Sequence, residues 1–396
     1  MFEIFLAIFL GIFLGVITGL LPGFHINLLA ALLFSISAFL LLNFEPLTIS
    51  VFIISIAITH IFLDILPSTF LGAPNEDYAL ASLPSHALLL QGNAYQAVIY
   101  LILGALSSII TFAILFPLLI PYSQLLYPLI SKFIPFILII ASIFLILKEK
   151  QKIPALIIFL LSGSLGLIIL NLDVKQPLLP LLSGLFGTSI LILSIKNKPV
   201  IPQQIIEFPK IEKKEFIKAI FLGFLSSITL GFLPSVSSSQ SSAISSSFQR
   251  LKRNTFLILT GFTSASFAML SLIALFSIEK TRSGFLVVIS RLLPEIKIKE
   301  ITIFILTALI AASTASIITI KLARYFSRII TKINYQLICI LALLVIIILV
   351  TIISEPLGLL VLITSTALGT IPQLKRISKV TLIGCLILPT ILFLLY

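Results

Sequence analysis

Two stretches of the chain share one pattern: FLGIFLGVITGLLPG, residues 9–23, and FLGFLSSITLGFLPS, residues 221–235, which lies 212 positions later. In both copies small residues recur at every fourth position of an apolar helix, and a proline then interrupts that helix. Proline lacks a backbone donor and clashes with the preceding turn, so at membrane depth it is tolerated where protein or a wet cavity satisfies the freed backbone groups. Two breaks at corresponding positions are typical of a transporter's binding site.

The composition determines the class of protein. The 396 residues are 59% hydrophobic and 10% charged, with a mean hydropathy of +1.25, and apolar runs recur along nearly the whole chain. A soluble core cannot absorb so much apolar sequence. Because Met1-Phe2-Glu3 lacks the basic start of a secretory signal, we expect the first segment to remain in the mature protein. We predict an all-α polytopic, multi-pass protein of the plasma membrane.

The formal net charge of +12 does not indicate nucleic-acid binding. Lys and Arg gather in short connections between apolar runs, as the positive-inside rule expects, and no basic domain with interleaved aromatic residues is present. The two cysteines, Cys339 and Cys385, lie in apolar segments without metal-ligand or disulfide spacing. We therefore expect them to be packing residues and expect no cofactor.

The lengths of the apolar runs predict the membrane spans. A continuous helix over 4–42 would be roughly 58 Å long, about twice the hydrocarbon thickness, and the same argument applies to 216–248. Each proline break should therefore end one helix and begin another. Further spans are expected near 49–71, 94–120, 126–147, 153–171, 178–195, 255–278, 300–324, 335–353, 357–373 and 377–395.

The lysine-rich connection at 196–218 marks a junction between two halves. We predict a first transmembrane repeat at 1–198, a cytoplasmic linker at 199–215 and a second transmembrane repeat at 216–396. If each broken pair is a re-entrant helix hairpin that returns to its own side, about five transmembrane helices follow it, and the halves are inverted repeats. Lys375, Arg376 and Lys379 are expected in a later cytoplasmic loop.

Two connections disobey this charge pattern. Residues 72–93 should be cytoplasmic but contain no Lys or Arg. Residues 279–299 should be outside, yet they contain Lys280, Arg282, Arg291, Lys297 and Lys299. Either the span count is wrong there, or these segments fold back into the protein.

A helix that begins inside the membrane exposes unpaired N–H groups and the positive end of its dipole, and it can bind an anion without a cationic side chain. The residues expected to bind substrate at the two breaks are Pro22, Gly23, His25 and Asn27, and Pro234, Ser235, Ser237, Ser238, Ser239 and Gln240. The alternative is that the serine run at 235–247 is a low-complexity linker. The small-residue ladder also favours close helix packing.

His60 and Asp64 are four residues apart in an apolar span, so they share one helix face. A carboxylate at such depth costs about 2.5 to 3.5 kcal/mol on insertion scales, and this cost indicates a role. We predict an ion-coupling site in which Asp64 takes a proton or helps to hold Na⁺ and His60 tunes it. The alternative is that Asp64 caps the helix at Leu66-Pro67.

A family resemblance is visible between the first spans. Gly72-Ala73-Pro74 is a Gly-x-Pro turn, Leu83-Pro84 is a proline-containing step, and Gly92 precedes the next span. Together with the Leu-Pro-Gly opening at 21–23 and its counterpart in 223–235, this pattern resembles the large membrane subunit (TctA-like) of the tripartite tricarboxylate transporter family. The resemblance covers most of the chain. It implies a site made of Pro22, Gly23, Gly72, Pro74, Pro234 and Ser235.

The resemblance also implies secondary transport of tricarboxylates or related carboxylates, with a small membrane subunit and an extracytoplasmic binding protein as partners. The chain departs from the family pattern in three ways. It is shorter, it has Asn75-Glu76-Asp77 where the family has Gly-Thr, and it has Leu83-Pro84 in place of an Asp-Gly-Tyr-Pro-like step.

The sequence thus predicts a secondary active transporter, not an enzyme, for an anionic solute such as a di- or tricarboxylate, coupled to Na⁺ or H⁺. A polyprenyl-phosphate translocase is the alternative, because the same breaks would suit a lipid phosphate. An intramembrane enzyme using a serine with His25 or His86 lacks an identified orienting acid. A purely structural membrane protein leaves both polar breaks unexplained.

Overall fold

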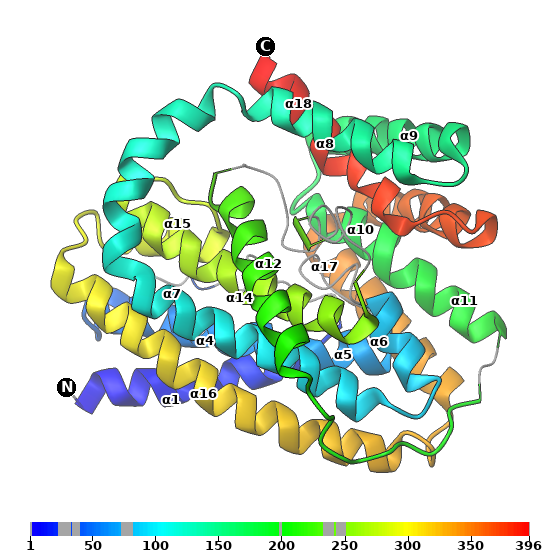
Figure 1. Ribbon diagram of the computed structural model, residues 1–396, viewed down its shortest axis with the longest axis horizontal. Coiled ribbons are helices and arrows are strands. Elements are labelled where there is room, and N and C mark those ends of the chain that lie inside the picture. The colour runs from blue at the N-terminus through cyan, green and yellow to red at the C-terminus, as the bar shows by residue number, and fades with distance from the viewer. Residues whose placement is uncertain are drawn as a thin grey trace.

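The computed structural model describes residues 2–22, 33, 40–72, 82–197, 200–232, 241–242 and 251–395. These residues form helices and connecting turns without any strand, and eight of the helices are long and apolar enough to cross a membrane. The predicted all-α membrane protein is therefore confirmed (Figure 1).

Helices α1 (Phe2–Leu20) and α4 (Pro46–Leu63) lie side by side and run in the same direction. The small-residue ladder makes this possible, because a Cβ on Gly15 would lie 2.6 Å from the Cβ of Thr59 and 2.9 Å from the carbonyl oxygen of Ile56. Close backbone approach of this kind drives helix association where lipid is as apolar as the side chains. The end of α1 at Gly19 thus lies beside Leu63, at the end of α4.

Helices α12 (Lys213–Phe232) and α14 (Arg253–Ile278) form a second parallel pair. Gly223 packs against the ring of Phe262, and one turn later the hydroxyl of Ser227 lies 2.6 Å from that of Ser266. The second pair therefore reproduces the arrangement of the first, with hydroxyl groups at part of the contact.

Each pair packs against a long helix from the other half. Helix α7 (Ala94–Ser131) runs along α14, where a Cβ on Gly104 would lie 1.9 Å from the carbonyl oxygen of Ile258. Helix α16 (Ile298–Ile329) runs along α4, and its Phe326 ring lies 5.8 Å from Phe70 in α5 (Ile65–Phe70). Figure 1 shows α1, α4 and α16 running one way and α7 and α14 the other.

The remaining helices of the first half also pack against helices of the second half. Helices α8 (Ile134–Lys148) and α9 (Lys152–Asn171) pack against α18 (Gly384–Leu395), where a Cβ on Gly166 would lie 1.9 Å from the carbonyl oxygen of Cys385. Helix α10 (Leu178–Leu182), the π-helix Ser183–Thr188 and α11 (Ser189–Asn197) pack against α17 (Tyr335–Lys375). There a Cβ on Gly369 would lie 2.3 Å from the carbonyl oxygen of Leu185.

Helix α17 consists of two arms. Glu355 interrupts it with a left-handed φ of 59°, just before Pro356. Both arms reach the same point of the π-helix, since Ile346 approaches Gly187 while the hydroxyl of Thr366 is hydrogen bonded to that of Thr188. The chain therefore turns back at Glu355, as the predicted spans at 335–353 and 357–373 require.

The predicted boundary between the spans at 94–120 and 126–147 is wrong. Helix α7 continues to Ser131 through Pro117, Pro121 and Pro128, and α8 begins only at Ile134. A proline inside a helix removes one ladder hydrogen bond and produces a kink, which need not end the helix. Figure 1 shows the last part of α7 curving away from α14 toward α8.

The two connections that disobey the charge pattern contain short helices that pack into the protein. Helix α6 (Ser82–Leu89) contacts α5 and α7. Helix α15 (Gly284–Leu292) buries Phe285, Leu286 and Ile289 and contacts α4 and α14. In their described parts, these segments therefore fold back into the protein.

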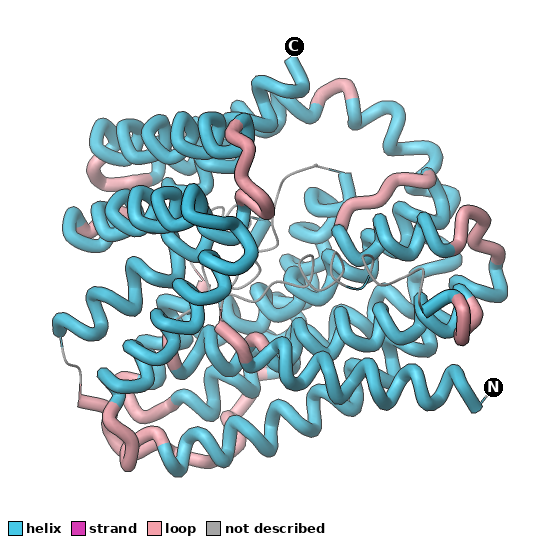
Figure 2. The backbone as a smooth tube through the Cα atoms, turned by 180° about the vertical axis from the view of Figure 1, so that it is seen from behind, coloured by secondary structure: helices cyan, strands magenta, loops and turns pink. Residues whose placement is uncertain are grey.

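Residues 200–212 run across one end of the helices, which we call the junction end. Gln204 accepts a hydrogen bond from the Ala94 amide at 3.0 Å and donates one to the Leu89 carbonyl at 3.0 Å. Lys252 lies 3.1 Å from Glu212 at this end, so α7, α12 and α14 all start here. Figure 2 shows several loops gathered on the side away from the N-terminus. Helix α14 ends at the opposite end, just before Lys280 and Arg282.

Candidate functional site

His60 is held against α1 by Thr18. The His60 side chain is 1% exposed, and its Nδ1 lies 3.2 Å from Thr18 Oγ1. The Thr18 hydroxyl also lies 3.0 Å from the Leu14 carbonyl oxygen, to which it donates. Which ring nitrogen of His60 donates depends on the tautomer of the imidazole. Thr18 thus holds the ring against α1.

Asp64 lies at the junction between α4 and α5 and is 1% exposed. Its backbone amide donates to the His60 carbonyl at 2.9 Å, which places the two side chains one turn apart. Although Asp64 occupies the N-cap position of α5, its side chain makes no capping hydrogen bond to the described residues of that helix. The helix-cap explanation of this buried carboxylate therefore has no support in the geometry.

Hydroxyl groups surround this junction. Thr59, Ser68 and Thr69 are completely buried, and their hydroxyl oxygens have no hydrogen-bond partner in the described part of the chain. Pro67 has no amide hydrogen to donate to the Leu63 carbonyl one turn earlier. Unsatisfied hydroxyls cost about 1 to 3 kcal/mol each, so a run of polar groups here is expensive unless it serves a ligand.

Gly72 follows α5 and has a φ of +64°, a conformation suited to glycine. A Cβ at this position would lie 3.4 Å from Cγ of His86, whose ring stacks on Tyr335 with centroids 6.0 Å apart. His86 Nδ1 lies 3.4 Å from the Thr69 carbonyl, and its Nε2 lies 3.4 Å from the Tyr335 hydroxyl. Gly72 is therefore a close-packing position next to the end of α5.

Two described residues after the second predicted break, Ser241 and Ser242, contact the helices α12 and α14. The Ser241 hydroxyl donates to the Ser226 carbonyl at 2.6 Å, and the Ser242 hydroxyl lies 2.5 Å from that of Thr263. Ser226 lies in the interior of α12, and Thr263 lies in the interior of α14. Nine residues after α12 ends, the chain is thus packed between these two helices, at a distance from their ends.

Most of the predicted substrate-binding residues lie outside the described residues. These are Gly23, His25, Asn27, Pro74, Pro234, Ser235, Ser237, Ser238, Ser239 and Gln240. Pro22, at the edge of the described part, is buried, and Gly72 is placed as given above. The structure brings together His60 and Asp64 as the sequence predicts, and it adds Thr18, which the sequence analysis overlooked because threonine is a common packing residue in such a ladder.

Lys379, expected in a cytoplasmic loop, begins the 3-10 helix Lys379–Ile383. Its side chain is 1% exposed, and Nζ lies 2.9 Å from Ser189 Oγ and 3.4 Å from the Phe186 carbonyl oxygen. Phe186 belongs to the π-helix, a form of helix in which carbonyls depart from the regular ladder. The position of a lysine next to basic neighbours in the sequence gave no signal of this burial.

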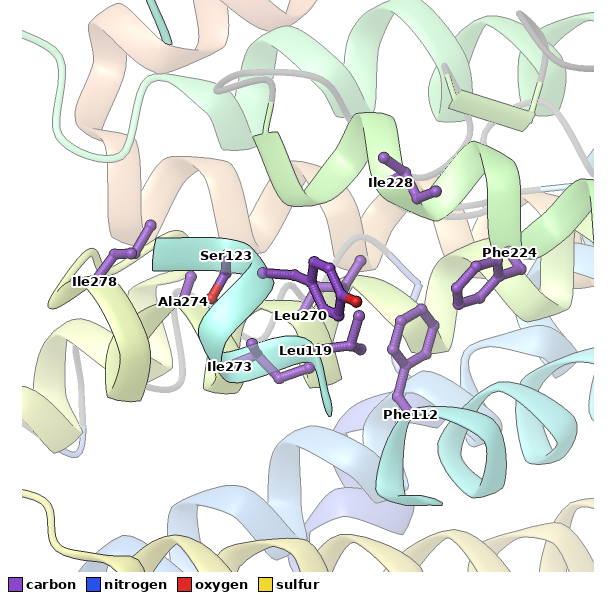
Figure 3. A pocket seen from close by; sticks show the side chains of 10 residues that line it. Phe112, Leu119, Ser123, Phe224, Ile228, Leu270, Ile273, Ala274 and Ile278 are labelled. Atoms are coloured by element: carbon purple, nitrogen blue, oxygen red, sulfur yellow. The ribbon is translucent and has the colours of Figure 1, made fainter. Parts of the chain in front are cut away.

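A cavity of about 200 Å³ lies between α7, α12 and α14 (Figure 3). Phe112, Ile273 and Ala274 form its buried walls, and Ile228 and Tyr122 lie at its exposed side. Ser123 contributes a polar group but bonds to Ser277 at 2.6 Å. This lining does not suit a polyanionic solute, and the cavity is separate from the cluster around Asp64.

Comparisons with known proteins agree with the fold. The model of the tripartite tricarboxylate transporter TctA family matches residues 5–384. An uncharacterized protein of Methanocaldococcus jannaschii is 32% identical over 387 residues, which cover 94% of each chain. No solved structure matches the chain. The chain therefore belongs to the tripartite tricarboxylate transporter TctA family, a family of membrane transport components and not of enzymes.

Proposed function

We propose that the chain is the large membrane subunit of a secondary active transporter that carries an anionic solute of the di- or tricarboxylate class across the plasma membrane. The observation that carries this proposal is the buried contact between Thr18 and His60, one helical turn from Asp64. Thr18 lies four residues before Pro22, where the first predicted break begins. A proton or Na⁺ taken up at Asp64 would therefore act directly beside the proposed substrate site.

The arrangement of the second half supports re-entrant substrate segments. Ser241 and Ser242 follow directly after the proposed anion-binding residues and pack between Ser226 and Thr263. The proposed substrate residues lie in the sequence between Phe232, the end of α12, and this packed segment. We propose that their backbone amides bind carboxylate oxygens at a re-entrant turn.

The packing of helices from each half against helices of the other half supports alternating access. The parallel pair α1–α4 and the parallel pair α12–α14 run in opposite directions and are each backed by a helix from the other half. These directions fit inverted repeats that rock against each other. Membership of a tripartite family also supports partner subunits, for which we propose a small membrane subunit and an extracytoplasmic binding protein.

Uptake into proteoliposomes tests the proposal. The reconstituted chain, alone and with its partner subunits, is given labelled di- and tricarboxylates under an imposed Na⁺ gradient, an imposed pH gradient or neither. We expect gradient-dependent uptake that falls about tenfold or more in Asp64→Asn. The exposed Asp173→Asn is the matched control and should transport normally.

Two results would contradict the proposal. Full gradient-driven uptake by Asp64→Asn would remove the coupling role of Asp64. Translocation of a labelled polyprenyl phosphate between leaflets, with no carboxylate uptake, would support the lipid-phosphate alternative instead.

A further inference from the structure

The cavity between α7, α12 and α14 opens toward the bilayer. Tyr122 and Ile228 at its exposed side are 52% and 42% exposed, and they adjoin an outer surface of exposed apolar residues that includes Leu118 and Leu225. In a membrane protein such a surface faces lipid chains. Figure 3 shows the side chains of all three helices converging on the cavity.

The size and lining of the cavity select its occupant. About 200 Å³ is less than the usual volume of a pocket for a drug-sized ligand. Eight of the ten lining side chains are apolar, and Ser123 is already bonded to Ser277. A hydrocarbon chain entering from the surrounding bilayer satisfies these conditions, whereas a carboxylate would lose its hydration without compensation.

Cationic groups lie at the end of this cavity, in the connection that disobeys the positive-inside rule. Ile278 lines the cavity, and the backbone amide of Lys280 lies 3.3 Å from the carbonyl oxygen of Ala274, another lining residue. The guanidinium of Arg282 lies 5.5 Å from the ring centre of Tyr127, one turn beyond Ser123 on α7. Lys280 and Arg282 thus flank the cavity, and Glu279, the acid in this turn, is exposed.

We propose that this cavity and the two cations form a binding site for an anionic membrane lipid, with one hydrocarbon chain in the cavity and the phosphate at Lys280 and Arg282. The site explains why basic residues are found at the end of the helices where the positive-inside rule does not expect them. Because the cavity is bounded by α12, a bound lipid would also brace the helix that leads to the second break.

The absence of tryptophan from the chain allows a direct test of cavity occupancy. Phe112→Trp places a single fluorophore on a wall that is 2% exposed, and Phe304→Trp places one in a buried position that does not line the cavity. In nanodiscs whose lipids carry brominated chains, we expect stronger quenching of the first variant than of the second. Leu119→Trp is a second reporter should Phe112→Trp fold poorly. Equal quenching of the cavity and control reporters would overturn the proposal.

The headgroup is tested by native mass spectrometry of the chain in mixed phosphatidylglycerol and phosphatidylcholine. Lys280→Gln/Arg282→Gln should reduce the preference for the anionic lipid by about 30-fold, whereas Lys297→Gln/Lys299→Gln, with the same charge change in the same segment, should preserve it. Ala274→Leu should reduce retention of both lipids. If the two double variants behave alike, the proposed phosphate site is wrong. If inorganic phosphate at equal concentration competes with the anionic lipid, the site binds free anions, and the proposal of a lipid site is wrong.

Discussion

The pair α1–α4 and the pair α12–α14 share one backbone arrangement but differ in chemistry. Both pairs are parallel, and both place a glycine of the first helix against the second helix, at Gly11 and at Gly223. When the helix contact at Gly11 is aligned with the helix contact at Gly223, His60 of α4 corresponds to Phe267 of α14 and Asp64 corresponds to Ser271. The first pair therefore carries the buried ionisable groups, while the second carries a ladder of hydroxyls.

This difference indicates a division of labour within a repeated scaffold. A buried carboxylate is expensive in a membrane, and a scaffold that needed it for packing would have kept it in both halves. The second pair satisfies the same geometry with the Ser227–Ser266 contact and no charge. The chemistry of Asp64 and His60 is thus additional to the requirements of the fold.

The largest expected effect comes from making the first pair resemble the second. Asp64→Ser should lower gradient-driven uptake by about tenfold or more, because the ionisable group is lost, while Ser271→Ala should leave uptake within about twofold. Both are measured in proteoliposomes with equal amounts of folded protein. If Ser271→Ala were the more damaging change, the division between the pairs would be refuted.

The next effect concerns packing. Gly15→Val and Gly223→Val both overpack a helix contact, which costs about 1 to 3 kcal/mol. The cost should be higher at Gly15, since its new Cβ meets the backbone carbonyl of Ile56, whereas the three nearest atoms to a Cβ at Gly223 all belong to the side chain of Phe262. Thermal unfolding in detergent measures the order of the two variants. A larger loss at Gly223 would show that the second pair is the more tightly fixed one.

A smaller effect separates the two polar contacts. Ser227→Ala removes one neutral hydrogen bond and should cost about 1 kcal/mol of stability without changing the pH dependence of uptake. Thr18→Val removes the hydroxyl that contacts Nδ1 of His60, so it should cost a similar amount and also change the pH profile of uptake. Identical pH profiles for Thr18→Val and the unaltered chain would remove the orienting role of Thr18.

The smallest expected effect is a pH dependence at the end of the first pair. Burial lowers the pKa of His86, in α6 outside the membrane-spanning helices, and the hydrogen bond to the Thr69 carbonyl opposes this only partly. The folded state thus favours the neutral ring, so stability is kept above the ordinary pKa of about 6.5 and is lost as pH falls below it. His86→Gln should flatten this dependence in thermal unfolding curves recorded between pH 5 and pH 7. If the stability of His86→Gln falls with pH as steeply as that of the unaltered chain, His86 is not the source of this dependence.

The sequence predicts the fold where local chemistry decides it. The small-residue ladder predicts close helix packing, the spans at 335–353 and 357–373 predict a break between them, and the spacing of His60 and Asp64 places both on one face. The continuation of α7 through three prolines could not be predicted, because packing against α14 decides whether a proline bends or ends a helix. The role of Thr18 and the burial of Lys379 depend on contacts between distant segments, which hydropathy does not report.

The packing of α18 has a consequence for biogenesis. Helix α18 is the principal partner of α9, through contacts at Gly163 and Gly166. During synthesis α9 leaves the ribosome long before α18, so the face of α9 must wait in the translocon or in lipid until α18 is made. A truncation that removes α18 would therefore leave this face uncovered, and quality-control proteases would recognise the damage far from the truncation.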